Sequence, residues 1–192
     1  MERKKFVEKF FSSSKRENVE KFDELVEKDL KEAYKRGVEF LGIKNEPFEF
    51  ESLVTSYPEG LLDKPKAKIV YDENKMRYNI ARFTNLSFGR DFLYYYTVIV
   101  DHGLGEIYND YSLDVSYLDV RGIEVSFKFK IINDVYHHIL ELKLLLQNGS
   151  IDVPLRVFVV DKDTDVESYK LKKETVEHLT NLKQFLRNKM SI

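Results

Sequence analysis

The chain of 192 residues contains no cysteine. Its own side chains therefore cannot supply a disulfide, a thiol nucleophile, a thiolate ligand for zinc or an iron–sulfur cluster. The absence also fits a reducing compartment, and we expect a cytoplasmic protein. Many lysines and glutamates without cysteine are typical of thermophilic proteins, although the asparagine content weighs against such a source.

The sequence also lacks a long apolar run and an excess of charge of one sign. No window reaches the roughly 18 apolar residues of a membrane span, and the basic segment 1–15 lacks the apolar stretch of a signal peptide. The 31 lysines and arginines nearly balance the 33 aspartates and glutamates, giving a net charge of −2. This balance creates no field that attracts nucleic acid or an anionic membrane. We therefore expect neither as a partner.

The motifs of several enzyme classes are missing. The sequence has no P-loop, no dinucleotide-binding glycine pattern, no G-x-S-x-G, no H-E-x-x-H and no zinc-ligand spacing. The segment Asp161–Asp165 begins like an EF-hand loop. However, Val166 stands where the turn glycine belongs and Lys172 where the bidentate glutamate belongs. We expect no metal and no cofactor, and the motifs leave open whether the chain is an enzyme.

The composition is that of a globular protein with a heavily charged surface. Hydrophobic residues make up 43% of the chain and charged residues 33%. The length is sufficient for one domain with a hydrophobic core and short for two. We therefore expect a single domain over residues 1–192.

The N-terminal part of the sequence predicts two helices. Residues 2–11 place their apolar side chains on one side of a helix. This pattern favours either a packed arm formed by residues 1–13 or a dimer contact, rather than a membrane-surface anchor. Ser14 and Glu17 then form a capping box, and Gly42 is placed to end the long helix that follows. Apolar residues recur at helical spacing through that helix: Val19, Phe22, Val26, Leu30, Ala33, Gly37 and Leu41.

Beyond Pro47 the apolar period falls to two, which predicts strands. Four segments fit the pattern: 48–54, 67–72, 76–83 and 92–102. The segment 57–67 between them reads as a long loop, and we expect Leu61 and Leu62 within it to be buried. At the other end of the chain, one stripe of apolar residues predicts a C-terminal helix: Val176, Leu179, Leu182, Leu186 and Met190.

Residues 112–131 predict a hairpin with a turn at Val120–Gly122. In the register that this turn sets, one face is almost wholly apolar and the other pairs Asp114 with Lys128. The pairs expected on the largely apolar face are Asp119–Ile123, Tyr117–Val125, Val115–Phe127 and Leu113–Phe129.

Residues 140–157 allow two interpretations. They form either a leucine-rich helix that ends at Asn148-Gly149 or a hairpin folded on this pair. In a helix the leucines spread over most of the circumference, which leaves Glu141 poorly placed. In a hairpin they share a face, with Glu141 opposite Arg156. The hairpin is favoured, and Pro154 then indicates an edge strand or a bulge. The expected pairs are Leu146–Ile151, Leu144–Val153, Leu142–Leu155 and Leu140–Val157.

These elements predict an α+β fold. We expect about eight antiparallel strands in hairpins, with the long N-terminal helix and the C-terminal helix packed on one face of the sheet.

Four residues are candidates for a ligand-binding site. His138 falls on the leucine face of the second hairpin, where it is either a base or ligand at a pocket rim or an ordinary packed histidine. His102 follows Asp101 in a glycine-containing turn, but neighbours on a strand point to opposite faces, so the two are not expected to pair. Tyr95 belongs to a tyrosine-rich strand and Arg82 lies in the strand before it. Aromatic and cationic groups there can line a cavity, although tyrosine is also an ordinary strand former.

The sequence supports two classes of function. The preferred hypothesis is a non-enzymatic binding or assembly module that self-associates, because its apolar stripes exceed what one modest sheet can cover. The alternative is a small-molecule pocket, enzymatic or not, between the curved sheet and the long helix. Tyr95, His102, His138 and Arg82 are the polar groups expected to line such a pocket.

Overall fold

The structure is a computed structural model that describes residues 2–13, 16–61, 64, 66–72, 75–160 and 171–190. It confirms the α+β class, with a helical N-terminus, a helical C-terminus and antiparallel sheets between them. The elements in chain order are α1 (Glu2–Ser12), α2 (Val19–Leu41), β1 (Phe50–Pro58), β2 (Ile69–Asp72), β3 (Lys75–Tyr78), β4 (Ile80–Phe88), β5 (Phe92–Asp101), β6 (Glu106–Ser116), the 3-10 turn η1 (Tyr117–Asp119), β7 (Val120–Ile132), β8 (Val135–Leu146), β9 (Gly149–Val160) and α3 (Lys173–Met190).

The strands form three sheets rather than the one sheet that the sequence predicted. Their orders are β1-β4-β5-β6, β2-β3 and β7-β8-β9. The chain divides into two compact units, one of Met1–Glu46, Leu53–Leu86 and Tyr94–Leu113, the other of Pro47–Ser52, Ser87–Leu93 and Asp114–Ile192. The helices α2 and α3 fall in different units. The single domain over residues 1–192 stays a prediction.

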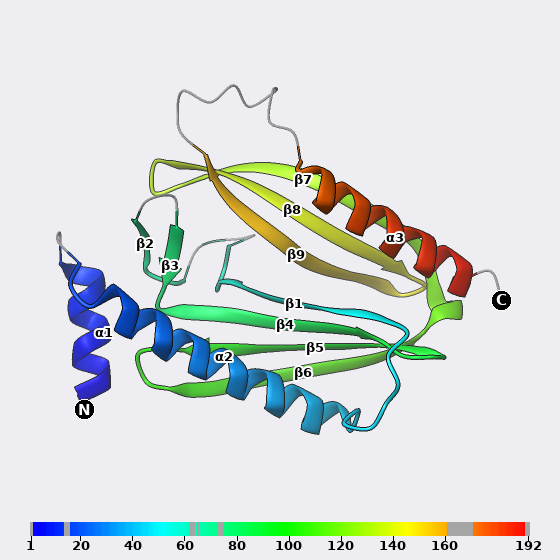
Figure 1. Cartoon of the computed structure of the whole chain (residues 1–192), viewed down its shortest axis with the longest axis horizontal. Helices are drawn as coiled ribbons and strands as arrows, with labels where there is room; N and C mark the ends of the chain where they lie inside the picture. Colours follow the sequence, from blue (N-terminus) through cyan, green and yellow to red (C-terminus); the bar gives the residue numbers. More distant parts are fainter. Residues whose placement is uncertain are drawn as a thin grey trace. The chain divides into compact units, whose positions relative to one another are not determined.

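In the first unit, α2 lies across the four-stranded sheet (Figure 1). Its predicted apolar stripe is confirmed, since Phe22, Ala33 and Gly37 are buried. The predicted C-terminal residue is also confirmed: Gly42 has a φ of 69° and donates its N–H to the carbonyl of Glu39. The helix begins at Val19 after Asn18, without a side-chain cap. Ser14 of the expected capping box lies outside the described residues.

The contact between α2 and the sheet is closest at Gly37. A β-carbon at this position would lie 2.6 Å from Cδ1 of Tyr96. The Tyr96 ring is fully buried, and its hydroxyl donates to Asp110 at 2.6 Å. Asp110 also accepts from Arg36 of α2 at 2.7 Å, and this hydrogen bond lowers the pKa of the Asp110 carboxyl. The helix is thus held against β5 and β6 by shape and by charge together.

The predicted N-terminal arm is a packed helix. Val7 and Phe10 of α1 are buried, and Phe10 stacks on Phe22 of α2 with the ring centroids 4.4 Å apart. Burying these rings removes apolar surface from water, which stabilises the docked arm. α1 therefore packs on α2 in this part of the chain.

The predicted strand 76–83 is two strands, because the chain changes sheets at Asn79. Before it, β3 pairs with β2, and after it β4 joins β1 and β5. The Asn79 side chain accepts from the backbone N–H of Lys68 at 2.6 Å, which holds the two-stranded ribbon closed. In the loop before β2, Leu61 is fully buried as predicted, whereas Leu62 lies outside the described residues.

In the second unit, the β8–β9 hairpin is confirmed and the helical alternative is wrong. From the turn to Glu141 the register differs from the expected one by two residues, because Leu146 pairs with Gly149 and the turn residues are Gln147 and Asn148. A shift of two preserves which side chains share a face. A bulge interrupts the ladder between Leu140 and Glu141, next to Pro154, as the proline indicated. Glu141 therefore lies opposite Pro154 rather than Arg156. Beyond the bulge the register differs by one residue, so that Leu140 lies opposite Arg156 rather than Val157.

The predicted hairpin over residues 112–131 is wrong. The strands β6 and β7 belong to different sheets, with η1 between them. β7 pairs instead with β8, which places Val125 opposite Leu142 and Phe127 opposite Leu140. The Asp114–Lys128 pair is also absent from these residues, because Lys128 pairs with Glu141 of β8.

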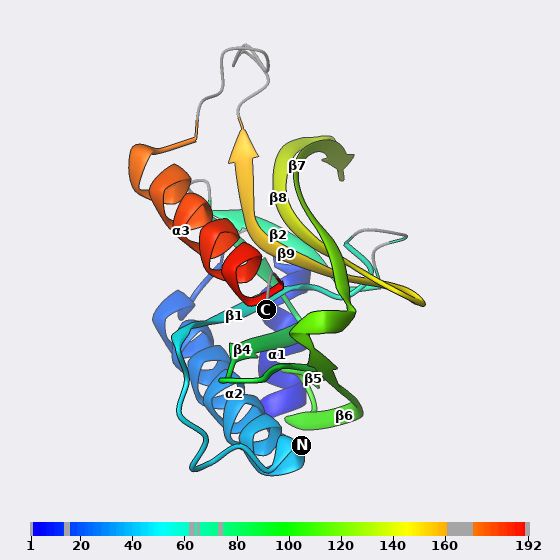
Figure 2. The same cartoon turned by 90° about the vertical axis from the view of Figure 1, so that its right-hand side faces the viewer.

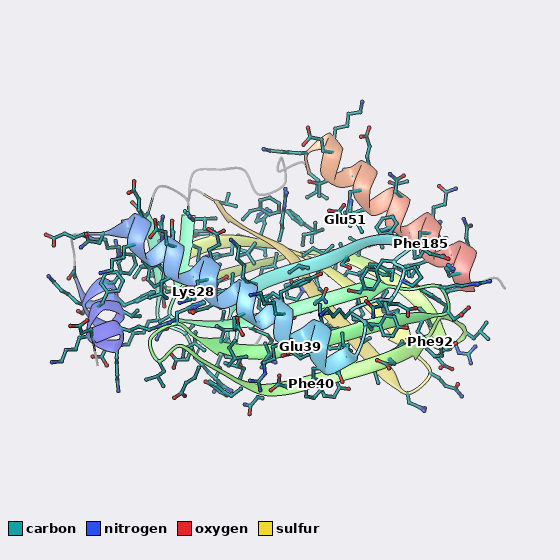
Figure 3. All side chains as sticks on the ribbon, turned by 60° about the horizontal axis from the view of Figure 1, so that its bottom comes forward. Lys28, Glu39, Phe40, Glu51, Phe92 and Phe185 are labelled. Atoms are coloured by element: carbon teal, nitrogen blue, oxygen red, sulfur yellow. The ribbon has the colours of Figure 1, made fainter. Side chains whose placement is uncertain are left out.

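The predicted C-terminal helix is α3, which packs on η1 and β7 within the second unit. Figure 2 shows it beside the three-stranded sheet. Leu179, Leu182 and Leu186 are buried, while Val176 of the same predicted stripe is exposed. Phe185, labelled in Figure 3, packs on Phe50 with the ring centroids 5.2 Å apart.

Candidate functional site

An apolar groove lies between α2 and the edge strand β1, in the first unit. It has a volume of about 670 Å³, within the usual range for small-molecule sites. Phe83 of β4 is buried and forms the floor, whereas Val54 of β1 is 47% exposed at the rim. The lining residues are Glu27, Leu30, Lys31, Tyr34, Lys35, Val54, Thr55, Ser56 and Phe83.

The charged groups of this groove lie on α2. Nζ of Lys31 is 2.6 Å from Oε1 of Glu27, and this hydrogen bond lowers the pKa of the Glu27 carboxyl. Nζ of Lys35 is 4.0 Å from Oε2 of Glu32, at the outer limit of an ion pair. Lys35 is thus the cation at the rim that is held less closely by its neighbouring carboxylate.

A second, smaller groove continues along α2 toward its N-terminal end. It has a volume of about 370 Å³ and shares Glu27 and Leu30 with the first groove. Its polar end is made by Asp23, whose Oδ1 accepts from Nε of Arg77 at 2.8 Å. The hydrogen bond to Arg77 is the main reason that the pKa of Asp23 falls from 3.8 to about 2. Lys75 also pairs with this carboxylate, at 2.7 Å.

His102, one of the predicted site residues, belongs to a buried polar cluster on the α2 side of the first unit. Its Nδ1 lies 2.8 Å from Oδ2 of Asp29, which also binds the guanidinium of Arg3. Nε of Arg3 donates to the His102 carbonyl at 2.9 Å. A carboxylate that holds an imidazole is a familiar catalytic arrangement, but His102 is fully buried among Phe22 and Tyr78. This cluster fastens α1 and α2 to the turn after β5.

The turn that contains His102 is an ordinary hairpin connection. Asp101 does not pair with His102, as the sequence predicted, and its side chain instead accepts from the N–H groups of Gly103 and Leu104 at 2.8 and 3.0 Å. Gly105 has a φ of 73°, a conformation that glycine adopts without strain.

Tyr95 and Arg82 lie on neighbouring strands, as alternation places them, on the face of the sheet that does not carry the Tyr96 ring. Arg82 donates to both carboxylate oxygens of Glu59 at 2.8 Å, a paired geometry that strengthens the contact. Burial raises the pKa of Tyr95, and it raises that of Tyr57 to about 12. These tyrosines therefore remain neutral hydrogen-bonding groups at ordinary pH.

His138 lies in the second unit, on the central strand β8. Its ring is 4.8 Å from that of Phe127 and 5.6 Å from that of Phe129. Burial lowers the pKa of His138, so the imidazole stays neutral at ordinary pH. Its surroundings are those of a histidine packed among aromatic rings.

The four predicted site residues thus fall in three places. Only Tyr95 and Arg82 are close enough to influence each other's charge, and the α2 groove is lined by other residues. Whether any of the four binds a ligand stays a prediction. Sequence patterns assigned Leu30 and Val54 to their helix and strand, but the space between them depends on how closely α2 approaches β1. No local pattern encodes that distance.

The described part of the chain gives two further results. Its His, Asp and Glu side chains form no group of three placed to hold a metal ion. None of the helices in that part has the length and apolar content needed to cross a membrane. Comparison of the chain with protein-family models, with curated proteins and with solved structures finds no match.

Proposed function

We propose that the chain is a non-enzymatic binding module. Its groove between α2 and β1 holds the apolar body of a small amphipathic ligand, and Lys35 binds an acidic head group of that ligand. The observation that carries the proposal is the open groove of about 670 Å³ with Phe83 as its floor and Val54 at its rim. Covering such surface is favourable by about 25 cal/mol per Å² of apolar area.

The chemistry of the lining supports binding rather than catalysis. Among the described residues of the lining, Tyr34, Thr55 and Ser56 carry hydroxyl groups, and none is a histidine that could activate one of them. The Ser56 hydroxyl is 2.9 Å from that of Tyr78, so it is held by a second hydroxyl rather than by a base. The alternative hypothesis from the sequence also expected a small-molecule pocket between the sheet and the long helix.

The test uses dodecanoate below its micelle concentration as the probe, with dodecyltrimethylammonium as the ligand of equal chain and opposite head charge. We expect dodecanoate to raise the melting temperature, because a ligand that binds only the native state stabilises it. Val54→Asp places a charge on the apolar rim and should abolish binding. Lys35→Glu should weaken dodecanoate binding about tenfold, because it turns an attraction into a repulsion.

Lys28→Glu is the matched control. Lys28 is an exposed residue of α2, labelled in Figure 3, that does not line the groove. It makes the same change of charge on the same helix, so we expect dodecanoate to bind this variant as it binds the wild type. Equal weakening by Lys28→Glu and Lys35→Glu, or unchanged binding to Val54→Asp, would contradict the proposal.

A further inference from the structure

The strand β7 forms one edge of the three-stranded sheet. It pairs with β8 along its length, and among the described residues no strand pairs with its other side. An edge of this kind presents a row of backbone N–H and C=O groups to any second strand. Many proteins protect such an edge with a proline, a bulge, a short strand, lysine side chains or a covering helix. β7 has 13 residues and no proline, and its one register shift lies at its start, between Val120 and Gly122.

The two faces of β7 differ sharply. Its odd-numbered residues from Ile123 to Ile131 are apolar and lie on the face that contains the leucines of β8. Three of them are exposed large side chains: Phe127 at 37%, Phe129 at 44% and Ile131 at 53%. The other face carries Glu124, Ser126, Lys128 and Lys130.

We propose that two copies of the chain associate through β7, as antiparallel strands about a two-fold axis that passes through Phe127. This inference is independent of the α2 groove. In that register Phe127 lies opposite its own copy, and the most exposed residue, Ile131, lies opposite Ile123 of the second copy. On the other face Lys130 lies opposite Glu124 of the second copy, and the symmetry produces this pair twice. A two-fold contact requires such self-complementarity.

The charges of β7 select among the registers that keep apolar residues opposite apolar residues. An axis through Lys128 places this lysine opposite itself, and an axis through Phe129 places Lys128 opposite Lys130. Like charges directly opposite are destabilising. An axis through Ser126 pairs Lys128 with Glu124 but leaves the exposed Ile131 opposite Arg121. The axis through Phe127 is the one of these four that satisfies both the charges and the exposed apolar residues.

The aromatic side chains of this edge are already ordered within one copy. The rings of Phe127 and Phe129 pack edge-on against His138, and Phe127 also lies 6.1 Å from Phe158 of β9. Side chains that are fixed before association lose less conformational freedom on binding. This order favours a specific contact over a loose apolar one.

Because the wild-type chain has no cysteine, single-cysteine variants test the register directly. Opposite residues of antiparallel strands have Cα atoms about 4.5–5.5 Å apart, within reach of a disulfide. Phe127→Cys should therefore form a covalent dimer on mild oxidation. The matched control is Ile131→Cys, which is more exposed but whose two copies would lie about 27 Å apart across the axis. We expect this variant to form the covalent dimer at least tenfold more slowly. The double variant Ile123→Cys/Ile131→Cys should form it readily, because each Ile131 lies opposite Ile123 of the second copy.

A second measurement keeps the test decisive if Phe127→Cys unfolds. Sedimentation of the wild type should show a reversible dimer, and Lys130→Glu should weaken it about tenfold because two ion pairs become repulsions. The double variant Glu124→Lys/Lys130→Glu restores both pairs and should return the dissociation constant to within about threefold of the wild type. A monomer at concentrations of about 100 µM would overturn the proposal. So would cross-linking that follows exposure, with Ile131→Cys faster than Phe127→Cys.

Discussion

Each of the two units is stabilised by its own kind of internal contact. In the first, polar side chains that are far apart in the sequence join helices to strands: Arg3 binds the His102 carbonyl across 99 residues, and Asp29 binds His102 across 73. In the second, three consecutive strands pair in order, and their central strand is buried through apolar cross-strand contacts.

This difference shows how each unit defines its structure. Hydrogen bonds and ion pairs are directional, so those of the first unit fix where α2 lies on its sheet. Apolar contacts are not directional, and in the second unit the ladder of backbone hydrogen bonds supplies the register instead. The first unit should therefore be sensitive to the loss of single charges, and the second to the loss of buried volume.

The largest expected effect is in the second unit. Leu142 is fully buried on β8, between Val125 and Val153. Leu142→Ala removes buried methyl groups and leaves a cavity, so we expect the free energy of unfolding to fall by about 3–4 kcal/mol. Chemical denaturation measures the loss, and hydrogen exchange should show it in β7, β8 and β9. The control is Leu118→Ala at an exposed position, which should change little. Equal losses of unfolding free energy in Leu142→Ala and Leu118→Ala would contradict the expected sensitivity of the second unit to buried volume.

The next effect is in the first unit. Asp29→Ala removes the carboxylate that binds both Arg3 and His102, and leaves a buried ring nitrogen without its acceptor. Breaking such a pair is costly, and because Arg3 is partly exposed we expect a loss of about 2–3 kcal/mol. Asp29→Asn keeps an oxygen that can accept from His102 and should lose about half as much. Denaturation curves of both variants that coincide with that of the wild type would show that the charge and its hydrogen bonds are unimportant here.

A smaller effect tests whether shape also fixes α2. Gly37→Ala improves the helix propensity by about 1 kcal/mol, but its β-carbon would meet the buried Tyr96 ring at 2.6 Å. Overpacking of this kind typically costs about 1–3 kcal/mol, so we expect a net loss of about 1–2 kcal/mol in thermal unfolding. Glu39→Ala, at an exposed position of the same helix (Figure 3), should lie within about 0.5 kcal/mol of the wild type. A stabilised Gly37→Ala would mean that the helix can move away from the sheet.

The smallest effect depends on pH. The pKa of Asp23 is lowered from 3.8 to about 2, chiefly by Arg77. A lowered pKa contributes stability that is complete above the unfolded value and is lost as the pH falls from about 4 to about 2. At pH 6 we expect the free energy of unfolding of the wild type to exceed that of Asp23→Asn by roughly 1 kcal/mol, a value reduced for partial exposure. Urea unfolding should show the two converging near pH 2, and a difference that is constant with pH would exclude this linkage.

The sequence predicted the second unit's hairpin because its partners are close together in the chain. A strict alternation on both sides of Asn148 left few arrangements. The turn was misplaced by counting Gly149 as a turn residue, and the bulge beside Pro154 shifts the pairs beyond it by one residue. The error at β6 has a related cause. The apolar residues of β7 can face those of β6 or those of β8 equally well, and alternation does not rank the two.

The candidate site was less predictable than the elements that form it. The helical stripe that includes Leu30 and the strand that includes Val54 were both predicted, but a groove is the space that remains after they pack. The pairing of His102 with Asp29 could not be predicted either, because Asp29 lies 73 residues away. Asp29 is also not one of the apolar residues that define the helical stripe. Distances of this kind follow from the whole packing of the unit.

The opposite edge of the three-stranded sheet limits what association through β7 can produce. β9 carries Pro154, which has no N–H to donate, and beside it the bulge that distorts the ladder. A sheet that can be extended at one edge alone stops growing once that edge is covered. Growth into a fibre would need two edges that can pair with a further strand. The irregularity in β9 prevents this second pairing, so association through β7 would end at a closed dimer.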